Sequence, residues 1–145
     1  MVPTFEDKNY LIIDEVSYRF SKPARGDVIV FHPPGHDRGI YYINRVIGLP
    51  GETVIIKDGT VTIVNAEHMD GFVLKEPYLE NLSDETLTRV LGEHEYFVMG
   101  DNRPASSDSR SWGTLPEKNI VGRAFLRLTP LKDIGIFPGS HHSYE

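Results

Sequence analysis

Residues 41–52 constrain the fold more than any other stretch, because they specify a strand and its end in one place. Aromatic and β-branched residues dominate 41–47, with neither glycine nor proline, and this composition is typical of a β-strand. Gly-Leu-Pro-Gly follows at 48–51, where proline fixes φ and glycine tolerates positive φ, so the chain turns. A second β-branched run begins at once at 53–57. We therefore expect a sheet.

Asn44 and Arg45 are adjacent polar residues in the middle of the first of these strands. Side chains alternate along a strand, so the two point to opposite faces of the sheet. We expect one of those faces to be buried, and a buried polar side chain needs hydrogen-bond partners. The residue at position 44 therefore bears directly on what the chain can do.

Further strands are predicted from β-branched and apolar runs at residues 10–18, 27–32, 61–64, 95–99 and 120–128. The Asp-Gly pair at 58–59 is a signal for a two-residue hairpin. We expect an antiparallel β-meander up to residue 64, and a mainly β fold with an antiparallel sheet core overall. At 145 residues the chain, residues 1–145, is long enough for a single domain with a buried core.

The pattern weakens between residues 65 and 94, and we interpret this segment as a surface insertion between core strands. Residues 83–91 fit two structures: a short helix capped by Ser83, or a loop that leads into a strand at 88–91. The local pattern does not separate these two alternatives.

Composition excludes several classes of function. The net charge of −6, with no clustered stripe of Lys and Arg, argues against a nucleic-acid-binding protein. Cysteine is absent, so disulfides and thiolate chemistry are excluded. No run approaches the ~18–20 apolar residues of a membrane-spanning helix, so the chain is expected to be soluble as it stands. His32 and His36 have a metal-ligand spacing, but Pro-Pro-Gly lies between them and prevents a helix, so we expect neither a metal site nor a cofactor.

The loop at 104–113 is dense in Ser, Asp and Arg and contains the single tryptophan. One interpretation is a solvated loop whose side chains cap its own turns. The other is a rigid lattice of carboxylate–guanidinium pairs formed by Asp101, Arg103, Asp108 and Arg110. A Ser-His-Asp triad is not indicated, because the chain has no Gly-x-Ser-x-Gly segment to position a nucleophile.

Four short segments carry a distinctive set of residues. They are Met-Val-Pro-Thr at 1–4, Arg-Gly-Asp-Val-Ile-Val-Phe at 25–31, Asn-Arg-Val-Ile-Gly-Leu-Pro-Gly at 44–51, and Gly-Asp-Asn-Arg at 100–103 followed by Ser106, Asp108, Ser109, Arg110, Trp112 and Gly113. Together, and in this order, they resemble the characteristic boxes of bacterial type I signal peptidases over nearly the whole chain. The resemblance implies a β catalytic core with a smaller cap at about residues 65–94. It also implies a parent protein anchored in the cytoplasmic membrane by N-terminal helices, with this domain on the extracytoplasmic face.

Members of this family remove signal peptides from exported preproteins with a Ser/Lys dyad, and the resemblance implies a role for particular residues. The nucleophilic serine stands immediately before the first box, so it falls outside this chain, and the general-base lysine falls at Asn44. Ser106 falls at the serine that orients the lysine. Ion pairs among Arg45, Asp101, Asp108 and Arg110 are implied to brace the site. The residues implied to line the pockets for an extended substrate, with small side chains at the first and third positions before the cut, are Met1, Phe5, Val30, Tyr42 and Ile43.

Asn44 is the departure from the family with the largest chemical consequence. Lysine can activate serine only when it is neutral, in an apolar site that lowers its pKa from ~10.4. An asparagine amide has no basic lone pair, and loss of the base typically costs on the order of 10⁴–10⁶ in rate. We therefore predict no measurable peptidase activity from this chain.

Two hypotheses follow from that departure. The first is a soluble piece of a genuine signal peptidase with a substituted base, in which the Asn44 side chain still hydrogen-bonds Ser106. The second is a natural non-catalytic pseudo-peptidase that binds exported segments or partner proteins without cutting them.

Overall fold

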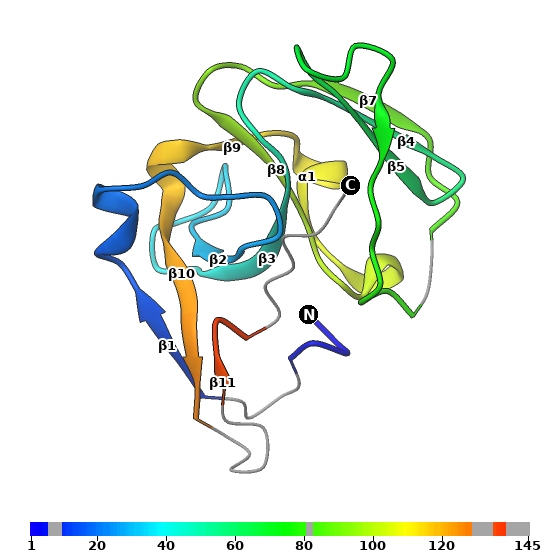
Figure 1. Ribbon diagram of the computed structural model, residues 1–145. Helices are drawn as coiled ribbons and strands as arrows, with labels where there is room; N and C mark the ends of the chain where they lie inside the picture. The colour runs from blue at the N-terminus through cyan, green and yellow to red at the C-terminus, as the bar shows by residue number, and fades with distance from the viewer. Residues whose placement is uncertain (6–9, 81–82, 129–134, 139–145) are drawn as a thin grey trace.

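A computed structural model of the chain describes residues 1–5, 10–80, 83–128 and 135–138 (Figure 1). The mainly β, antiparallel fold expected from the sequence is confirmed. The strands are β1 (Leu11–Asp14), β2 (Val28–Phe31), β3 (Tyr42–Gly48), β4 (Thr53–Lys57), β5 (Thr60–Val64), β6 (Phe72–Val73), β7 (Leu87–Val90), β8 (Glu95–Met99), β9 (Leu115–Pro116), β10 (Ile120–Arg127) and β11 (Gly135–Ile136). Short helical turns are η1 (Ser17–Arg19), η2 (Arg103–Ala105), α1 (Ser109–Trp112) and η3 (Glu117–Asn119). None of the helices in the described ranges has the length and hydrophobicity needed to cross a bilayer.

The first sheet has the strand order β1-β10-β2-β3-β8-β9, with β11 also paired to β10. All of these pairings are antiparallel. The predicted β-meander is wrong in two places: β10 separates β1 from β2, and β3 and β4 belong to different sheets. The turn at 48–51, with Gly51 at φ 81°, sends the chain out of the first sheet rather than back along it. The pairing of β1 with β10 joins segments far apart in the chain, so no local sequence pattern predicts it.

The second sheet has the order β6-β5-β4-β7 and lies to one side of the first (Figure 1). Asp58 and Gly59 join β4 to β5 with φ of 49° and 76°, which confirms the predicted two-residue hairpin. For residues 83–91, the structure selects the strand over the helix, since β7 pairs with β4. The segment at 65–94 contributes β6 and β7, whereas the other two strands precede it. Its description as an inserted cap stays a prediction.

Three apolar clusters form the core, and one of them joins the two sheets. The shared core joins β3 and β8 to the second sheet, and includes Ile47, Val54, Ile56, Val61, Ile63, Leu74, Tyr78, Leu91, Phe97 and Met99. The loop-side cluster lies on one face of the first sheet and contains Ile29, Phe31, Val46, Tyr96, Val98 and Leu115, with Trp112 against it. The terminus-side cluster lies on the other face and contains Phe5, Val28 and Ala124. Since β3 has apolar clusters on both faces, its polar residues Asn44 and Arg45 are both buried, at 5% and 0% exposure.

The turn after β3 is fixed by the carboxylate of Glu52. It accepts two hydrogen bonds from Arg25, at 2.8 and 2.7 Å, one from the Leu49 N–H at 2.8 Å and one from Asn65 Nδ2 at 2.9 Å. Burial by itself raises the pKa of Glu52, but these hydrogen bonds outweigh it, so its pKa lies below the usual value. Glu52 therefore connects the turn after β3 to Arg25, which precedes β2, and to Asn65, which follows β5.

We expect Gly48→Ala to lower the free energy of unfolding by about 1–3 kcal/mol. A methyl group at Gly48 would lie 2.5 Å from Val54 Cγ2, 2.7 Å from Leu91 Cδ1 and 3.0 Å from Phe97 Cβ, within the shared core. Gly39→Ala is the matched control, because a methyl group there meets nothing within 4 Å. Urea unfolding of both variants measures the difference, and equal stabilities would show that the second sheet does not pack closely on β3.

Glu52 is also expected to make stability depend on pH. Its pKa is lowered on folding, so its contribution is fully present above the unfolded pKa near 4.5 and is lost as pH falls through the folded pKa. The difference in unfolding free energy between the parent and Glu52→Gln should therefore be constant near neutral pH and shrink below 4.5. Denaturant titrations down to about pH 3 measure it. A difference that stays constant over that range would contradict the lowered pKa.

Candidate active site

A fully buried ion pair between Arg45 and Asp101 supports the site. Arg45 lies on β3, and Asp101 follows the end of β8, which is the next strand in the sheet. The pair is bidentate, with Arg45 Nε 2.9 Å from Asp101 Oδ1 and Nη2 2.7 Å from Oδ2. Arg45 Nη1 donates to the Gly26 carbonyl at 3.0 Å, and the guanidinium lies 3.9 Å from the ring centre of Tyr78. Thr4 Oγ1 donates to Asp101 Oδ2, so the N-terminal box is joined to the same pair.

The loop after β8 is tied back to that strand by Asp108 and Ser109. The Asp108 carboxylate accepts from the Gly100 N–H at 3.0 Å, and from Arg110 Nε and Nη2 at 2.8 and 2.9 Å. It also caps α1, accepting from the Arg110 backbone N–H. Ser109 Oγ accepts from the Val98 N–H at 3.0 Å. The loop is therefore a rigid lattice rather than a solvated turn, and the structure brings the predicted Asp108 and Arg110 together as an ion pair.

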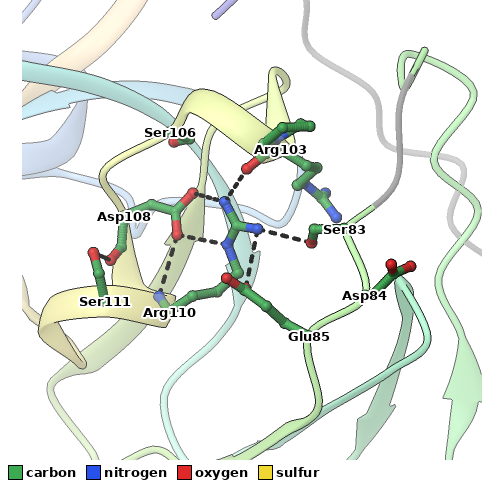
Figure 2. A pocket seen from close by; sticks show the side chains of 9 residues that line it. Ser83, Asp84, Glu85, Arg103, Ser106, Asp108, Arg110 and Ser111 are labelled. Atoms are coloured by element: carbon green, nitrogen blue, oxygen red, sulfur yellow. Dashed lines mark hydrogen bonds and ion pairs between the residues drawn. The ribbon is translucent and has the colours of Figure 1, made fainter.

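Arginines of this loop also reach the chain that leads into β7, as Figure 2 shows. Arg110 Nη1 donates to Ser83 Oγ at 2.9 Å and pairs with Glu85 at 3.2 Å. Arg103 pairs with Glu76, and both side chains are almost fully buried. Sequence reasoning missed these partners because residues 65–94 have no periodic pattern, and single Glu or Ser residues there give no signal.

Asn44 and Ser106 both lie beside Gly100. A methyl group at Gly100 would lie 2.2 Å from Ser106 Oγ and 3.5 Å from Asn44 Oδ1, so glycine is needed here to leave room for Ser106. The Asn44 amide donates to the Ser107 carbonyl at 3.5 Å. The expected hydrogen bond from Asn44 to Ser106 is not among those made by the described residues. The Asn44 side chain donates instead to the backbone carbonyl of the next residue, Ser107.

Three of the five predicted substrate-lining residues lie together. Met1 and Ile43 pack against the terminus-side cluster, to which Phe5 belongs. Val30 is the cross-strand partner of Ile43 in the β2–β3 pairing. Tyr42 points to the opposite face of the sheet and packs against the loop-side cluster.

The two buried aspartates of the site are each held by an arginine. Asp101 and Asp108 each form an ion pair with an arginine, so neither is free to serve as a general base. Desolvation opposes the charge on Arg110, but its contacts with Asp108 outweigh this and raise the pKa of the guanidinium. Residue 44 itself supplies no base, because an asparagine amide is not basic.

The histidines that suggested a metal spacing lie in one loop and contact its backbone. His32 Nδ1 is 3.1 Å from the Ile40 carbonyl, and His36 Nδ1 is 3.1 Å from the Pro34 carbonyl. Across the described ranges, no group of three His, Cys, Asp or Glu side chains is placed to hold a metal ion.

Comparison with known proteins gives consistent matches. The model of the family described as signal peptidase, peptidase S26, matches residues 1–129. A protein of Synechocystis sp. named probable signal peptidase I-1 is 43% identical over 137 residues, which cover 90% of this chain and 67% of that protein. Signal peptidase I of Leptolyngbya laminosa is 40% identical over 144 residues, covering 93% and 67%. The crystal structure of a signal peptidase I from Enterococcus faecalis is similar with a TM-score of 0.59 and 35% identity, covering 71% of this chain and 97% of that one.

We expect Asp108→Ala to destabilise the chain by about 3–5 kcal/mol, because it leaves the Gly100 N–H without its partner and removes the carboxylate from Nε and Nη2 of the buried Arg110 side chain. Asp84→Ala is the control, since Asp84 lines the same pocket but is exposed. Thermal and urea unfolding compare the two variants. Equal melting temperatures would contradict a bracing role for Asp108.

Proposed function

Because the chain belongs to the peptidase S26 family of signal peptidases, we propose that it is a signal peptidase I domain, a serine endopeptidase unit that removes N-terminal signal peptides from exported preproteins. The observation that carries the proposal is the convergence of Asn44 and Ser106 on Gly100, above the buried Arg45–Asp101 pair. Residue 44 is 5% exposed and has Ile29 as its cross-strand partner. An apolar, desolvated slot of this kind lowers the pKa of a lysine, as a Ser/Lys dyad requires.

The proposed substrate is an extended peptide with small side chains at the first and third positions before the cut. Met1, Phe5 and Ile43 form an apolar wall against which such side chains can pack, with Val30 on the neighbouring strand. On the same family basis, the parent protein is anchored in the cytoplasmic membrane, and this domain acts on the extracytoplasmic face.

With Asn44 in place, we propose that the domain does not cleave. The amide cannot accept the proton of a serine nucleophile. The carboxylates of Asp101 and Asp108 each form an ion pair with an arginine. The cost of losing the base is about 5–8 kcal/mol of barrier, from on the order of 10⁴–10⁶ in rate.

A second candidate function is binding without cleavage, by a natural pseudo-peptidase. The observation that favours it is the hydrogen bond from the buried Asn44 amide to the Ser107 carbonyl, which gives the neutral side chain a partner within the site. The proposed substrate-contacting residues are the same in both candidates, so binding alone does not distinguish them.

Restoring the dyad tests the proposal. A variant with a serine directly before Met1 and Asn44→Lys should cleave a peptide with alanine at the first and third positions before the cut. Asn44→Met with the same serine is the matched control, because it fills the slot without supplying a base. Mass spectrometry of the products identifies the cut.

The outcomes separate the two candidates. Cleavage by the Asn44→Lys variant, with none by the Asn44→Met control, supports the peptidase. A folded lysine variant that binds the peptide and leaves it intact contradicts the peptidase and supports the binding protein.

A further inference from the structure

Both backbone polar groups of Gly100 are hydrogen-bonded to side chains of the following loop, and Ser106 packs against this glycine. Its N–H donates to Asp108 Oδ2 at 3.0 Å, and its carbonyl accepts from Arg103 Nε at 3.1 Å. Ser106 Oγ packs so closely on the Gly100 Cα that a methyl group would lie 2.2 Å away. A shift of Gly100 must therefore move Ser106 relative to residue 44.

The Arg103 end of this clamp depends on Glu76. Arg103 Nη1 lies 3.3 Å from Glu76 Oε2, and Nη2 donates to Oε1. The two side chains are 2% and 7% exposed, so neither charge has water as an alternative partner. Without the carboxylate, Arg103 would be a buried unpaired cation, and the favourable response is to swing toward solvent. That movement releases the Gly100 carbonyl.

Tyr78 joins the same carboxylate to the buried pair under the site. Its hydroxyl donates to Glu76 Oε1 at 2.9 Å, and its ring lies 3.9 Å from Arg45 Cζ. A guanidinium at this distance from a ring face is attracted to it, more strongly when both are desolvated. Glu76 and Tyr78 therefore contact both arginines that hold Gly100 and Asp101, although they lie in the segment between β6 and β7.

A third contact closes the network on the loop side, as Figure 2 shows. Arg110 Nη2 donates to the Arg103 carbonyl at 2.7 Å, while its Nη1 donates to Ser83 Oγ. Arg103 is therefore restrained at both its side chain and its backbone.

We infer that Glu76 and Tyr78 are positioning residues that hold Ser106 in register with residue 44. This inference rests on the proposed function, since the register matters for catalysis only if residue 44 is the seat of the base. A role limited to stability would lower the unfolding free energy and leave the geometry around Gly100 unchanged. A positioning role must also change the surroundings of residue 44.

The first test needs no activity and uses the present chain. In Glu76→Gln, we expect the NMR signals of the Gly100 amide and the Asn44 side-chain amide to shift, and the Gly100 amide to exchange faster. Glu52→Gln is the matched control, because Glu52 has the same 7% exposure and also pairs with an arginine, the 12%-exposed Arg25, at the turn beyond β3. Unchanged signals in Glu76→Gln, or equal changes in both variants, would overturn the inference.

The second test uses the variant with the restored serine and Asn44→Lys. Glu76→Gln and Tyr78→Phe should lower kcat about 10- to 100-fold with little change in KM, as expected for misplacement of a catalytic group. The acidic limb of the kcat/KM profile should move to higher pH, because a less tightly held lysine is better hydrated and its pKa rises toward ~10.4. Glu52→Gln should leave that limb in place.

The two tests fail in different ways. If the restored variant does not cleave, the proposed function fails, and the NMR result still decides whether Glu76 positions Ser106. If it cleaves and Glu76→Gln loses only stability, with kcat and the acidic limb unchanged, the positioning role is wrong.

Discussion

The burial of the Arg45 guanidinium is the constraint on which the rest of this structure depends. A charge with 0% exposure is tolerated only when its attraction to a partner and its hydrogen bonds repay desolvation. Asp101, the Gly26 carbonyl and the Tyr78 ring supply these contacts from three separate parts of the chain. The end of β8, the start of β2 and the segment after β6 must therefore all meet at β3. The relative placement of the two sheets follows from that meeting as well as from the shared apolar core.

The same scaffold also explains why an uncharged side chain is accommodated at residue 44. Residue 44 occupies a desolvated slot on the opposite face of β3 from Arg45, between Ile29 and the Gly100 backbone. Burial there would lower the pKa of a lysine, and the same position accepts an uncharged amide without the cost of burying a charge. Asn44 is therefore compatible with the fold, and the loop that carries Ser106 keeps its own ion pairs. Under the proposed function, catalysis would depend on the side chain at residue 44, whereas the ion pairs that hold the loop involve several residues.

Local signals in the sequence were reliable where the structure is itself local. Asp58 and Gly59 form the expected hairpin because two residues with positive φ suffice to reverse a twisted ribbon. The predicted meander was wrong because the pairing of β1 with β10 depends on packing between segments that are distant in the sequence. Glu76 and Tyr78 escaped notice for a related reason: Glu76 lies 27 positions from Arg103 in a segment with no periodic pattern. An isolated glutamate carries no sign of the arginine it will meet.

The sequence by itself determined the mainly β class, the strand at 41–47 with its turn, the family resemblance and the chemical departure at Asn44, because each depends on residue types at fixed spacing. Only the tertiary structure decided which strands pair, that both faces of β3 are buried, and which partners satisfy its polar residues. Arg45 and Asp101 lie 56 positions apart in the sequence and 2.7 Å apart in the fold. The energy of desolvating a charge depends on everything packed around it, and that quantity exists only once the chain has folded.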